Sequence, residues 1–465
     1  MNMINVRRLT VMTFLGAGML SGISAQVSPL QVDTLKETKI PDQWDLQSCI
    51  DYAKEQNITI RKNRITAVST QIDVKTAKAA LFPSLSFSTG HQVVNRPYQE
   101  TSSRVSGSEI ISSNSKTSYN GNYGLNASWT LYNGNKRLKT IQQEKLNNQM
   151  AELDVATSEN NIQESIAQVY IQILYAAESV KVNENTLQVS IAQRDRGQEL
   201  LNAGSIAKSD LAQLEAQVST DRYQLVTAQA TLEDYKLQLK QLLELDGENE
   251  MNIYLPALSD ENVLAPLPTK KDVYISALSL RPEIEASKLN VEASELGIDI
   301  AKSSYFPTIS LSAGIGTNHT NGSDFTFGEQ VKNGWNNSIG LSVSVPIFNN
   351  RQTKSAVQKA KLQYETSMLS LLDEQKTLYK TIEGLWLDAN SAQQRYAAAN
   401  EKLKSTQISY ELISEQFNLG MKNTIELLTE KNNLLQAQQE QLQAKYMAIL
   451  NMQLLKFYQG DQLAI

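Results

Sequence analysis

Two short motifs in this chain carry side chains that could make ionic and hydrogen-bonded contacts, and both follow the same spacing. A glycine is followed six residues later by a carboxylate, as Gly204 with Asp210 and again as Gly420 with Glu426. Glycine allows a tight turn that a Cβ atom would obstruct, and it leaves room for the close approach of another chain. A carboxylate in the first turn of the helix that follows meets the positive end of the helix dipole. The motifs therefore predict two polar turns, in which the carboxylates either cap helices or bind a partner.

Other residues that could do chemistry are sparse. The chain has two histidines, His91 and His319, and one cysteine, Cys49, and it contains no HExxH or CxxC spacing. A metal site would therefore have to rely on carboxylates, and we expect neither a metal nor a cofactor. We find no nucleophile elbow and no phosphate-binding loop, so no catalytic residue is predicted. A net charge of −6 without a dense basic stripe argues against a nucleic-acid partner, and nothing in the sequence argues for an enzyme.

The two motifs belong to a repeat that runs through the chain. Three pairs of segments match at displacements of 216 to 224 positions: Lys78–Gly90 with Lys302–Gly314, Gly124–Asn135 with Gly340–Arg351, and Leu201–Leu211 with Phe417–Leu427. The first pair changes from a helical period to a strand period. The sequence therefore predicts two copies of one helix–strand–strand–helix–helix unit, residues 26–245 and 271–465, joined by a linker over 246–270.

Four segments without charge alternate apolar with small polar residues. They predict strands at about 84–94, 119–132, 308–318 and 336–348. In the last of these, Leu341 and Val343 would face one side and Ser342 the other. A barrel wall between lipid and water needs this alternation, although a half-exposed sheet in a soluble protein shows it too. The strand pairs are joined by polar loops, Arg96–Ser118 and His319–Trp335, which are expected to face outside the cell.

Aromatic residues mark the points where predicted helices and strands meet. The helix-to-strand switches carry Phe-Pro pairs and the strand-to-helix returns carry one aromatic residue each: Phe82-Pro83, Phe306-Pro307, Tyr132 and Phe348. The prolines end the preceding helices. The four rings would lie at one level, as the aromatic girdle of a membrane barrel does, with packing in a protein core as the alternative.

The remaining chain is predicted to be helical. Each unit opens with a shorter helix, about 46–80 or 271–304, and its strand pair is followed by a stretch without proline, about 133–203 or 349–419. A helix of roughly 70 residues would be about 105 Å long and needs a neighbour along its length. Helices at about 205–245 and 421–458 would return antiparallel and complete coiled-coil hairpins. The linker is expected to form a belt on the surface.

The N-terminal 25 residues have the layout of a secretory signal peptide. Arg7 and Arg8 precede an apolar run from Leu9 to Ile23, and Ser24-Ala25 provides a small-residue exit. No later apolar run approaches the roughly 20 residues that a spanning helix requires. The predicted fold class is therefore mainly α with a membrane β part. Four strands cannot close a barrel, so oligomerisation is implied: a dimer would supply eight strands and a trimer twelve, with an open channel.

The sequence resembles the TolC-like outer-membrane factors of Gram-negative efflux pumps and secretion systems. The resemblance covers nearly all of the mature chain and rests on the two Phe-Pro pairs, on Arg281-Pro282-Glu283 and on the two glycine motifs. It implies a homotrimer with a twelve-stranded barrel in the lipid of the outer membrane and a helical tunnel in the periplasm. It also implies docking to a periplasmic adaptor that belongs to an inner-membrane RND or ABC transporter.

The resemblance also implies a closed entrance at the two hairpin turns. There Lys422 would pair with Ser209 and Asp210 across neighbouring hairpins, and an exposed ion pair of this kind contributes at most about 1 kcal/mol, which a docking partner could overcome. Some members of the family carry a second acidic residue three positions after the one that matches Glu426. This chain has Thr429 at that position, followed by Glu430. The resemblance therefore does not imply an acidic ring in this chain.

The expected function is a passive exit duct in the outer membrane, and the competing class is a periplasmic coiled-coil adaptor or scaffold. The charge-free strands and the duplication disfavour the adaptor. Drug efflux and type I protein secretion are not separable from these residues. Metal export is less favoured because the ten methionines are scattered.

Overall fold

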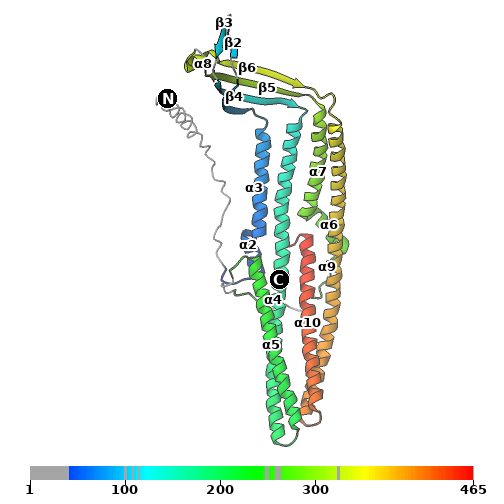
Figure 1. Ribbon diagram of the computed structural model, residues 1–465. Helices are drawn as coiled ribbons and strands as arrows, with labels where there is room; N and C mark the ends of the chain where they lie inside the picture. The colour runs from blue at the N-terminus through cyan, green and yellow to red at the C-terminus, as the bar shows by residue number, and fades with distance from the viewer. Residues whose placement is uncertain are drawn as a thin grey trace, which may run out of the picture. The chain divides into compact units, whose positions relative to one another are not determined.

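The computed structural model describes residues 41–98, 102–106, 109–113, 116–246, 251–256, 263–321 and 325–463. The predicted signal peptide, residues 1–25, lies outside these ranges. Residues from Pro41 onward form one compact unit, and the following description concerns that unit. It consists of long helices that run side by side, a four-stranded antiparallel sheet that continues from them, and a separate two-stranded sheet (Figure 1).

The long helices come in corresponding pairs from the two repeats. The helices are α2 (Leu46–Gln56), α3 (Ile58–Ala79), α4 (Lys136–Asn202), α5 (Lys208–Leu242), α6 (Lys270–Leu280), α7 (Pro282–Lys302), η3 (Ser303–Tyr305), α8 (Phe327–Asn333), α9 (Gln352–Asn418) and α10 (Thr424–Gln459). α4 and α9 each contain 67 residues, and α5 and α10 return along them as antiparallel hairpins. The predicted hairpins are therefore present in both halves.

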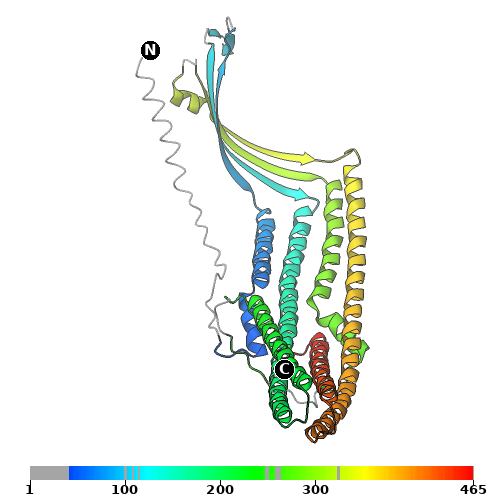
Figure 2. The same ribbon diagram turned by 60° about the horizontal axis from the view of Figure 1, so that its bottom comes forward.

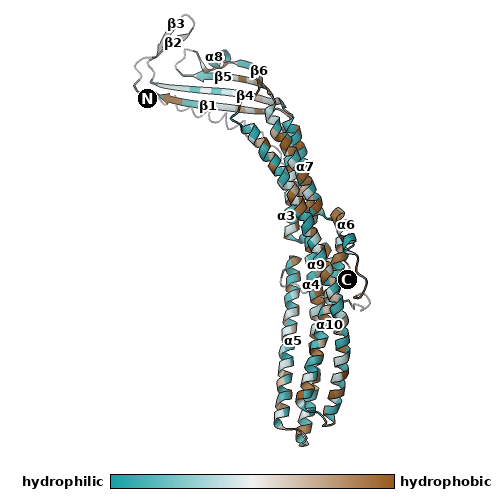
Figure 3. Cartoon of the chain, turned by 90° about the vertical axis from the view of Figure 1, so that its right-hand side faces the viewer, coloured by the Kyte–Doolittle hydropathy of each residue, from teal (hydrophilic) through white to brown (hydrophobic). Residues whose placement is uncertain are grey.

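Contacts between helices give a lateral order near the sheet and another in the hairpin region. Near the sheet, α3 packs on α4, α4 on α7 and α7 on α9. In the hairpin region the order is α5, α4, α10 and α9, since α10 contacts α4 far more than α5. Apolar and polar residues alternate along all of these helices (Figure 3). In the part of the chain that the structure describes, no helix has both the length and the apolar character that crossing a membrane requires.

The opening helix of each repeat is broken, contrary to the predicted single helices over 46–80 and 271–304. The break falls at Asn57 between α2 and α3 and at Arg281 between α6 and α7, which are equivalent positions 224 residues apart. Asn57 accepts hydrogen bonds from the N–H groups of Thr59 and Ile60 and so caps α3. Pro282 disfavours helical backbone at the residue before it, and it is itself well suited to the first turn of α7.

The sheet has the order β1-β4-β5-β6, and all of its neighbours are antiparallel (Figure 2). The strands are β1 (Ser84–Asn95), β2 (Ser102–Ser106), β3 (Glu109–Ser113), β4 (Thr117–Asn133), β5 (Thr308–Thr320) and β6 (Asn336–Ser344). All four predicted strands exist. β6 ends four residues before Phe348, because Pro346 has no N–H group to continue the ladder.

Two connections contain structure that the sequence did not predict. The loop between β1 and β4 carries a separate hairpin of β2 and β3, and the loop between β5 and β6 contains the short helix α8. α8 begins with a reciprocal cap, in which Thr326 Oγ1 accepts from the N–H of Glu329 and Glu329 Oε2 accepts from the N–H of Thr326. The polar composition of these two loops therefore gave no indication of the short helix or of the hairpin.

The main apolar core lies where the linker crosses the helices. Trp44, Cys49 and Tyr170 are almost fully buried in it, and the Tyr170 hydroxyl donates to the carbonyl oxygen of Tyr254 at 2.6 Å. The described parts of the linker thus lie against the helices. Burial raises the pKa of the Cys49 thiol to about 12, so almost none of it is the reactive thiolate at neutral pH.

Arg281, the first residue of the Arg-Pro-Glu motif, forms a buried ionic cluster that joins three helices. Its side chain is 6% exposed, and it contacts Glu283 Oε1 at 2.7 Å and Glu164 Oε1 of α4 at 3.1 Å. Its guanidinium carbon lies 4.2 Å from the ring centroid of Tyr458 on α10. Burial raises the pKa of Glu164 even though the guanidinium opposes the shift. The motif therefore has a structural role in holding α7 against α4 and α10.

Replacing this arginine should destabilise the fold strongly. Arg281→Ala leaves two largely buried carboxylates without their cation, which lowers the free energy of unfolding by about 3–5 kcal/mol. Thermal unfolding followed by circular dichroism would measure the loss. Lys288→Ala is the matched control, because Lys288 pairs with Glu285 in an exposed contact that contributes at most about 1 kcal/mol. Equal melting temperatures for the two variants would contradict the structural role.

Candidate functional site

One face of the sheet is apolar and uncovered in the chain. Residues that pair directly across antiparallel strands project from the same face. One such row contains Leu85, Ala127, Ala313 and Ile339, and the next contains Phe87, Leu125 and Ile315. Leu85 is 70% exposed and Ile339 is 79% exposed. A water-soluble sheet would need another layer over this face. The described chain places only the seven-residue helix α8 against the outer end of β5, and Leu85 and Ile339 stay exposed.

The opposite face of the same strands is polar and small. One row consists of Ser84, Ser128, Ser312 and Gly340, and it pairs across all four strands. A second row carries Ser86, Asn126, Gly314 and Ser338. This confirms the predicted alternation of apolar and small polar residues. A wall with these two faces can separate lipid from water.

The four predicted interfacial aromatics lie at the end of the sheet from which the helices continue. Phe82 and Phe306 precede β1 and β5 by two residues, Tyr132 is the penultimate residue of β4, and Phe348 follows β6. Phe82, Phe306 and Phe348 are at least half exposed. Pro83 and Pro307 directly precede the two strands, as expected for the switch. A girdle role for these rings stays a prediction.

A second aromatic cluster, which the sequence analysis missed, lies toward the other end of the apolar face. The Tyr119 hydroxyl lies 2.7 Å from His91 Nδ1, and the ring of His319 packs at 5.4 Å from Tyr119 and at 5.0 Å from Phe327. His91 and His319 both pair with Gly121, which separates them on β4. Their spacing in sequence gave no signal, because a three-strand register brings them together. Across the described residues, no three His, Cys, Asp or Glu side chains are grouped to hold a metal ion.

The glycines of the two motifs form the hairpin turns, as predicted, but for a different reason. Gly204 and Gly420 both have φ of +74°, a backbone conformation that side chains disfavour, and each closes the turn by donating its N–H to Leu201 or Phe417. A Cβ atom at either position would meet nothing within 4 Å in the chain. The left-handed backbone conformation therefore explains the glycines within the chain, and their role in the close approach of another chain stays a prediction. Within the chain a close approach occurs at Gly197, where a Cβ atom would clash with Leu214 Cδ1.

The two carboxylates cap the helices that return from these turns. Asp210 Oδ2 accepts from the N–H of Ala207 at 3.0 Å, and Glu426 Oε2 accepts from the N–H of Asn423 at 3.2 Å. The cap of α10 is reciprocal, since Asn423 Oδ1 accepts from the N–H of Glu426 at 2.9 Å. The capping role is therefore present in the chain, and a role in binding stays a prediction for both residues.

Lys422 pairs with Glu426 within its own turn, at 2.6 Å between Nζ and Oε1. This hydrogen bond holds the pKa of Glu426 below its usual range, so the contact persists at neutral pH and is lost as the pH falls through the lowered pKa. The predicted pairing of Lys422 with Ser209 and Asp210 across neighbouring hairpins stays a prediction.

The axial register of the hairpins is compatible with that pairing. α5 and α10 both lead away from the turns, and two contacts join them: Asp221 with Lys431, and Gln217 with Asn432. Lys422 lies nine residues nearer the turn than Lys431 and ten nearer than Asn432. On α5, moving nine residues toward the turn from Asp221 reaches position 212, and moving ten residues toward it from Gln217 reaches position 207. Lys422 is therefore level with a segment that contains Ser209 and Asp210.

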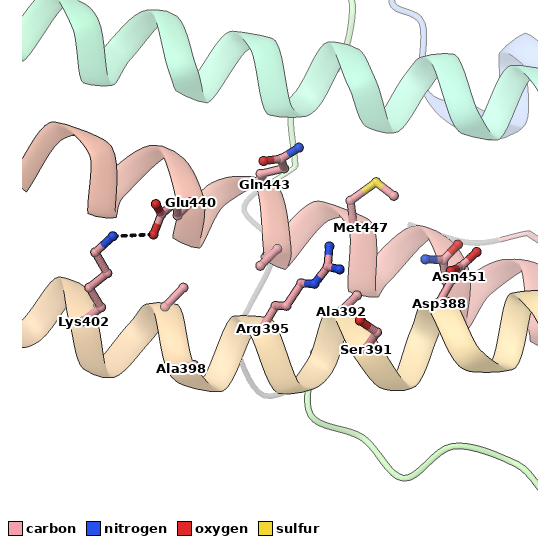
Figure 4. Close-up of a pocket in the computed structure, with 12 residues that line it drawn as sticks. Asp388, Ser391, Ala392, Arg395, Ala398, Lys402, Glu440, Gln443, Met447 and Asn451 are labelled. Carbon is pink, nitrogen blue, oxygen red and sulfur yellow. Dashed lines mark hydrogen bonds and ion pairs between the residues drawn. The ribbon is translucent and has the colours of Figure 1, made fainter.

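A pocket of about 510 Å³ lies between α9 and α10, away from the turns (Figure 4). Asp388, Arg395 and Lys402 line it from α9, and Lys402 Nζ contacts Glu440 Oε2 of α10 at 2.7 Å. Figure 4 shows Arg395 extending from α9 toward α10. The three α9 residues are spaced seven positions apart. This regular spacing of charges is the signal by which the sequence could have indicated the pocket.

A largely uncovered apolar sheet face, a polar reverse face and long helical hairpins that continue from the strands define a class of protein whose sheet can separate lipid from water. The sequence model of the family described as "Outer membrane efflux protein" matches residues 49–244 and 273–460. The chain therefore belongs to the outer membrane efflux protein family. The family resemblance inferred from the Phe-Pro, Arg-Pro-Glu and glycine motifs is confirmed.

Individual relatives are distant in sequence. The outer membrane efflux protein BepC of Brucella suis is 24% identical over 290 residues, which cover 62% of this chain and 60% of BepC. The chain thus spans about three fifths of the length of that relative. Toxin and drug export protein A of Aggregatibacter actinomycetemcomitans is 22% identical over 428 residues, covering 89% of this chain and 87% of that protein. The solved structure of CusC has the same fold, with a TM-score of 0.75 at 19% identity, and covers 90% of this chain and 92% of CusC.

Proposed function

We propose that three copies of this chain form a passive channel in the outer membrane, the exit duct of a tripartite efflux pump or type I secretion system. Each copy contributes four strands to a twelve-stranded barrel in the lipid of the outer membrane. The helical hairpins form a tunnel in the periplasm. The observation that carries this proposal is the sheet, which has an apolar and uncovered face, a polar reverse face and two outer strands, β1 and β6, each paired on one side only among the described strands.

Closure with other copies would satisfy both outer strands at once. An open sheet edge cannot face hydrocarbon, because its N–H and C=O groups would lack partners there. β1 and β6 lie at opposite edges of the sheet, so β6 of one copy can pair with β1 of the next. Such head-to-tail contacts generate a closed ring. Twelve strands would leave an open lumen lined by the serine-rich face.

The helices carry matching unpaired surfaces at the same two sides. On α3, Ile58, Ile65 and Ile72 are exposed and lie seven residues apart, which is the spacing of a coiled-coil seam. On α9, at the other end of the lateral order, Leu362 and Leu369 are exposed at the same spacing. The proposed ring would bury the α3 seam of one copy against α9 of the next.

The hairpin turns are the proposed docking surface for a periplasmic adaptor. Leu419 and Met421 are each 71% exposed beside Gly420, near Lys422 and the carboxylate of Glu426 that caps α10. Exposed apolar residues surrounded by charges are typical of a protein-binding patch. The adaptor would belong to an inner-membrane RND or ABC transporter, which supplies the energy. One relative is named for the export of both toxin and drugs, and both substrate classes are retained for this chain.

The competing role, a periplasmic adaptor or coiled-coil scaffold, would share the long hairpins. An adaptor or scaffold would have no function for a sheet whose apolar residues are exposed on one face. We therefore rank the adaptor role below the channel.

Three measurements test the channel. The full chain should fractionate with the outer membrane, migrate as a trimer on a semi-native gel, and produce discrete conductance steps in planar bilayers. A photo-reactive amino acid at Lys208 or at the exposed Ile425 should capture an adaptor in living cells. A monomeric chain in the soluble periplasmic fraction, without conductance, would refute the channel.

A further inference from the structure

The short helix α8 lies against the apolar face of the sheet, at the end far from the long helices (Figure 1). The hydroxyl of Thr317 on β5 donates to the carbonyl oxygen of Val331 at 2.8 Å, and the ring centroids of His319 and Phe327 are 5.0 Å apart. Thr317 and His319 belong to the same alternating set of β5 as Ile315, which projects from the apolar face. In a barrel whose apolar face contacts lipid, α8 would therefore lie outside the wall.

The apolar face changes its character at the level of α8. Going outward along the strands, an apolar row is followed by two rows that mix aromatic, polar and small side chains. The apolar row is Phe87, Leu125 and Ile315, and the two rows that follow are Thr89, Tyr123, Thr317 and His91, Gly121, His319. Tyrosine has an apolar ring and a polar hydroxyl, and it is enriched where hydrocarbon meets lipid headgroups. The outer boundary of the apolar band therefore falls at the row of Thr317, which holds α8.

The distance from this row to the other end of the band agrees with the thickness of a membrane. Phe306 stands at the helix-to-strand switch, and Thr317 follows it by eleven residues. At about 3.3 Å per residue these span about 36 Å along the strand, or roughly 28 Å of height at the tilt of about 40° that barrel strands have. The apolar band of outer-membrane barrels is about 25 Å tall. α8 would therefore lie where the headgroups of the outer leaflet begin.

Three aromatic side chains around this helix stay partly exposed. Phe325 is 54% exposed, Phe327 is 41% exposed and Trp335 is 57% exposed. Trp335 directly precedes β6 and stands two residues before Asn337, which pairs with Ile315 on the apolar face. A helix whose role was to cover the sheet from water would bury these rings. Half-exposed aromatic rings at the edge of an apolar band are typical of a membrane interface.

Hydrogen bonds hold α8 at a set height on the sheet. Gln330 Oε1 accepts from the N–H of Thr320 at 2.9 Å, and Gln330 Nε2 donates to the carbonyl oxygen of Phe325 at 2.9 Å. The C-terminal end of α8 is also close to β5, because a Cβ atom at Gly334 would lie 2.7 Å from Asn318 Oδ1. The exposed rings are therefore carried by a helix that is fastened to the strand at both ends.

We propose that α8, with Phe325, Phe327 and Trp335, is an anchor that lies in the headgroup zone of the outer leaflet, on the outside of the barrel. Its partner is the lipid surface. The proposal rests on the proposed function, because it requires the apolar face to contact lipid. It adds that the loop between β5 and β6 contacts the membrane and does not project freely from it. A trimer would carry three such anchors.

Depth-dependent fluorescence quenching tests the anchor. Full-length channels are labelled at one introduced cysteine and placed in phosphatidylcholine vesicles that carry a nitroxide either on the headgroup or in the middle of the acyl chain. The labelled variants are Gly328→Cys on α8, Leu341→Cys on the apolar face of β6 and Ser342→Cys on its polar face. A Cβ atom at Gly328 meets nothing within 4 Å, so the label should not disturb the helix. The buried Cys49 should not react.

The three labels should respond differently. We expect the headgroup nitroxide to quench the label on α8 severalfold more than the acyl-chain nitroxide does, with the reverse order for Leu341→Cys. The label in Ser342→Cys should respond only to iodide in the water. A label on α8 that responds to iodide alone, with Leu341→Cys quenched by lipid, would overturn the anchor and leave the proposed channel intact. A label in Leu341→Cys that neither lipid quenches would refute the lipid-facing wall, and the anchor with it.

Substitution of the exposed rings examines the anchor itself. Phe325→Asp with Trp335→Asp places two carboxylates at the headgroups and should reduce headgroup quenching of the α8 label severalfold, without changing the label in Leu341→Cys. Phe325→Tyr with Trp335→Tyr keeps aromatic rings and is the matched control, which should retain the quenching. A semi-native gel verifies that both variants are trimers. Unchanged quenching in the aspartate variant, or equal loss in the tyrosine variant, would overturn the anchor.

Discussion

Asp210→Arg combined with Glu426→Arg should abolish export while leaving assembled channels in the outer membrane. Each wild-type carboxylate caps a helix, and Glu426 also binds Lys422. The arginines remove two helix caps and place positive charge at the positive ends of two helix dipoles. The helix cores are far from these turns and keep their packing, so the loss should be confined to the docking surface. Drug susceptibility of a host that lacks its own channel is the measurement.

A neutral variant separates docking from helix capping. In Asp210→Asn with Glu426→Gln the side-chain oxygens can still accept the same N–H groups, but the charges are gone. We expect partial export from this variant and none from the arginine variant, with trimers of normal mobility in both. Wild-type susceptibility in the arginine variant would remove the turns from the docking surface. Loss of the trimer would show that the carboxylates act on assembly.

Leu341→Arg should prevent stable insertion of the channel. Leu341 lies in the middle of β6, is 65% exposed and projects from the apolar face opposite Leu311. An arginine at the midplane of the lipid face destabilises a barrel by about 2–4 kcal/mol, and a trimer would carry three of them. The amount of trimer in the outer-membrane fraction measures the effect.

The neighbouring residue provides the control. Ser342 pairs with Ser310 on the polar face, so Ser342→Arg would project into the water-filled lumen and should permit insertion while altering ion selectivity. Equal yields of trimer from Leu341→Arg and Ser342→Arg would show that the two faces have the same surroundings. The assignment of lipid and lumen faces would then be wrong.

Much of this architecture was predictable because it depends on local patterns. Alternation along each strand, proline at each helix-to-strand switch and glycine at each turn act over a few residues, and the structure has all four strands and both hairpins near the predicted positions. The carboxylates after the glycines were also found in advance. Their capping role follows from the number of residues between each carboxylate and its turn, which can be read from the sequence.

Other features depend on partners that are distant in sequence. Asp221 and Lys431 are separated by 210 residues, and as single charges on polar helices they resemble the many exposed ones. Their burial follows from the packing of α4, α5 and α10, which no local period specifies. The same holds for His91 and His319, which the strand register places on either side of Gly121. The break at Asn57 depends in part on its hydrogen bond to the carbonyl of Leu242.

The uncovered face and the two open edges of the sheet also constrain how the protein can be made. The helices have neighbours within their own chain and can fold while it is alone in the periplasm. The strands of the proposed ring cannot: without the neighbouring copies, the chain presents Leu85, Phe87 and Ile339 to water, together with two unpaired strand edges that any extended segment could join. Assembly and insertion should therefore be one concentration-dependent step. When the chain is overproduced, the unassembled excess should aggregate or bind periplasmic chaperones.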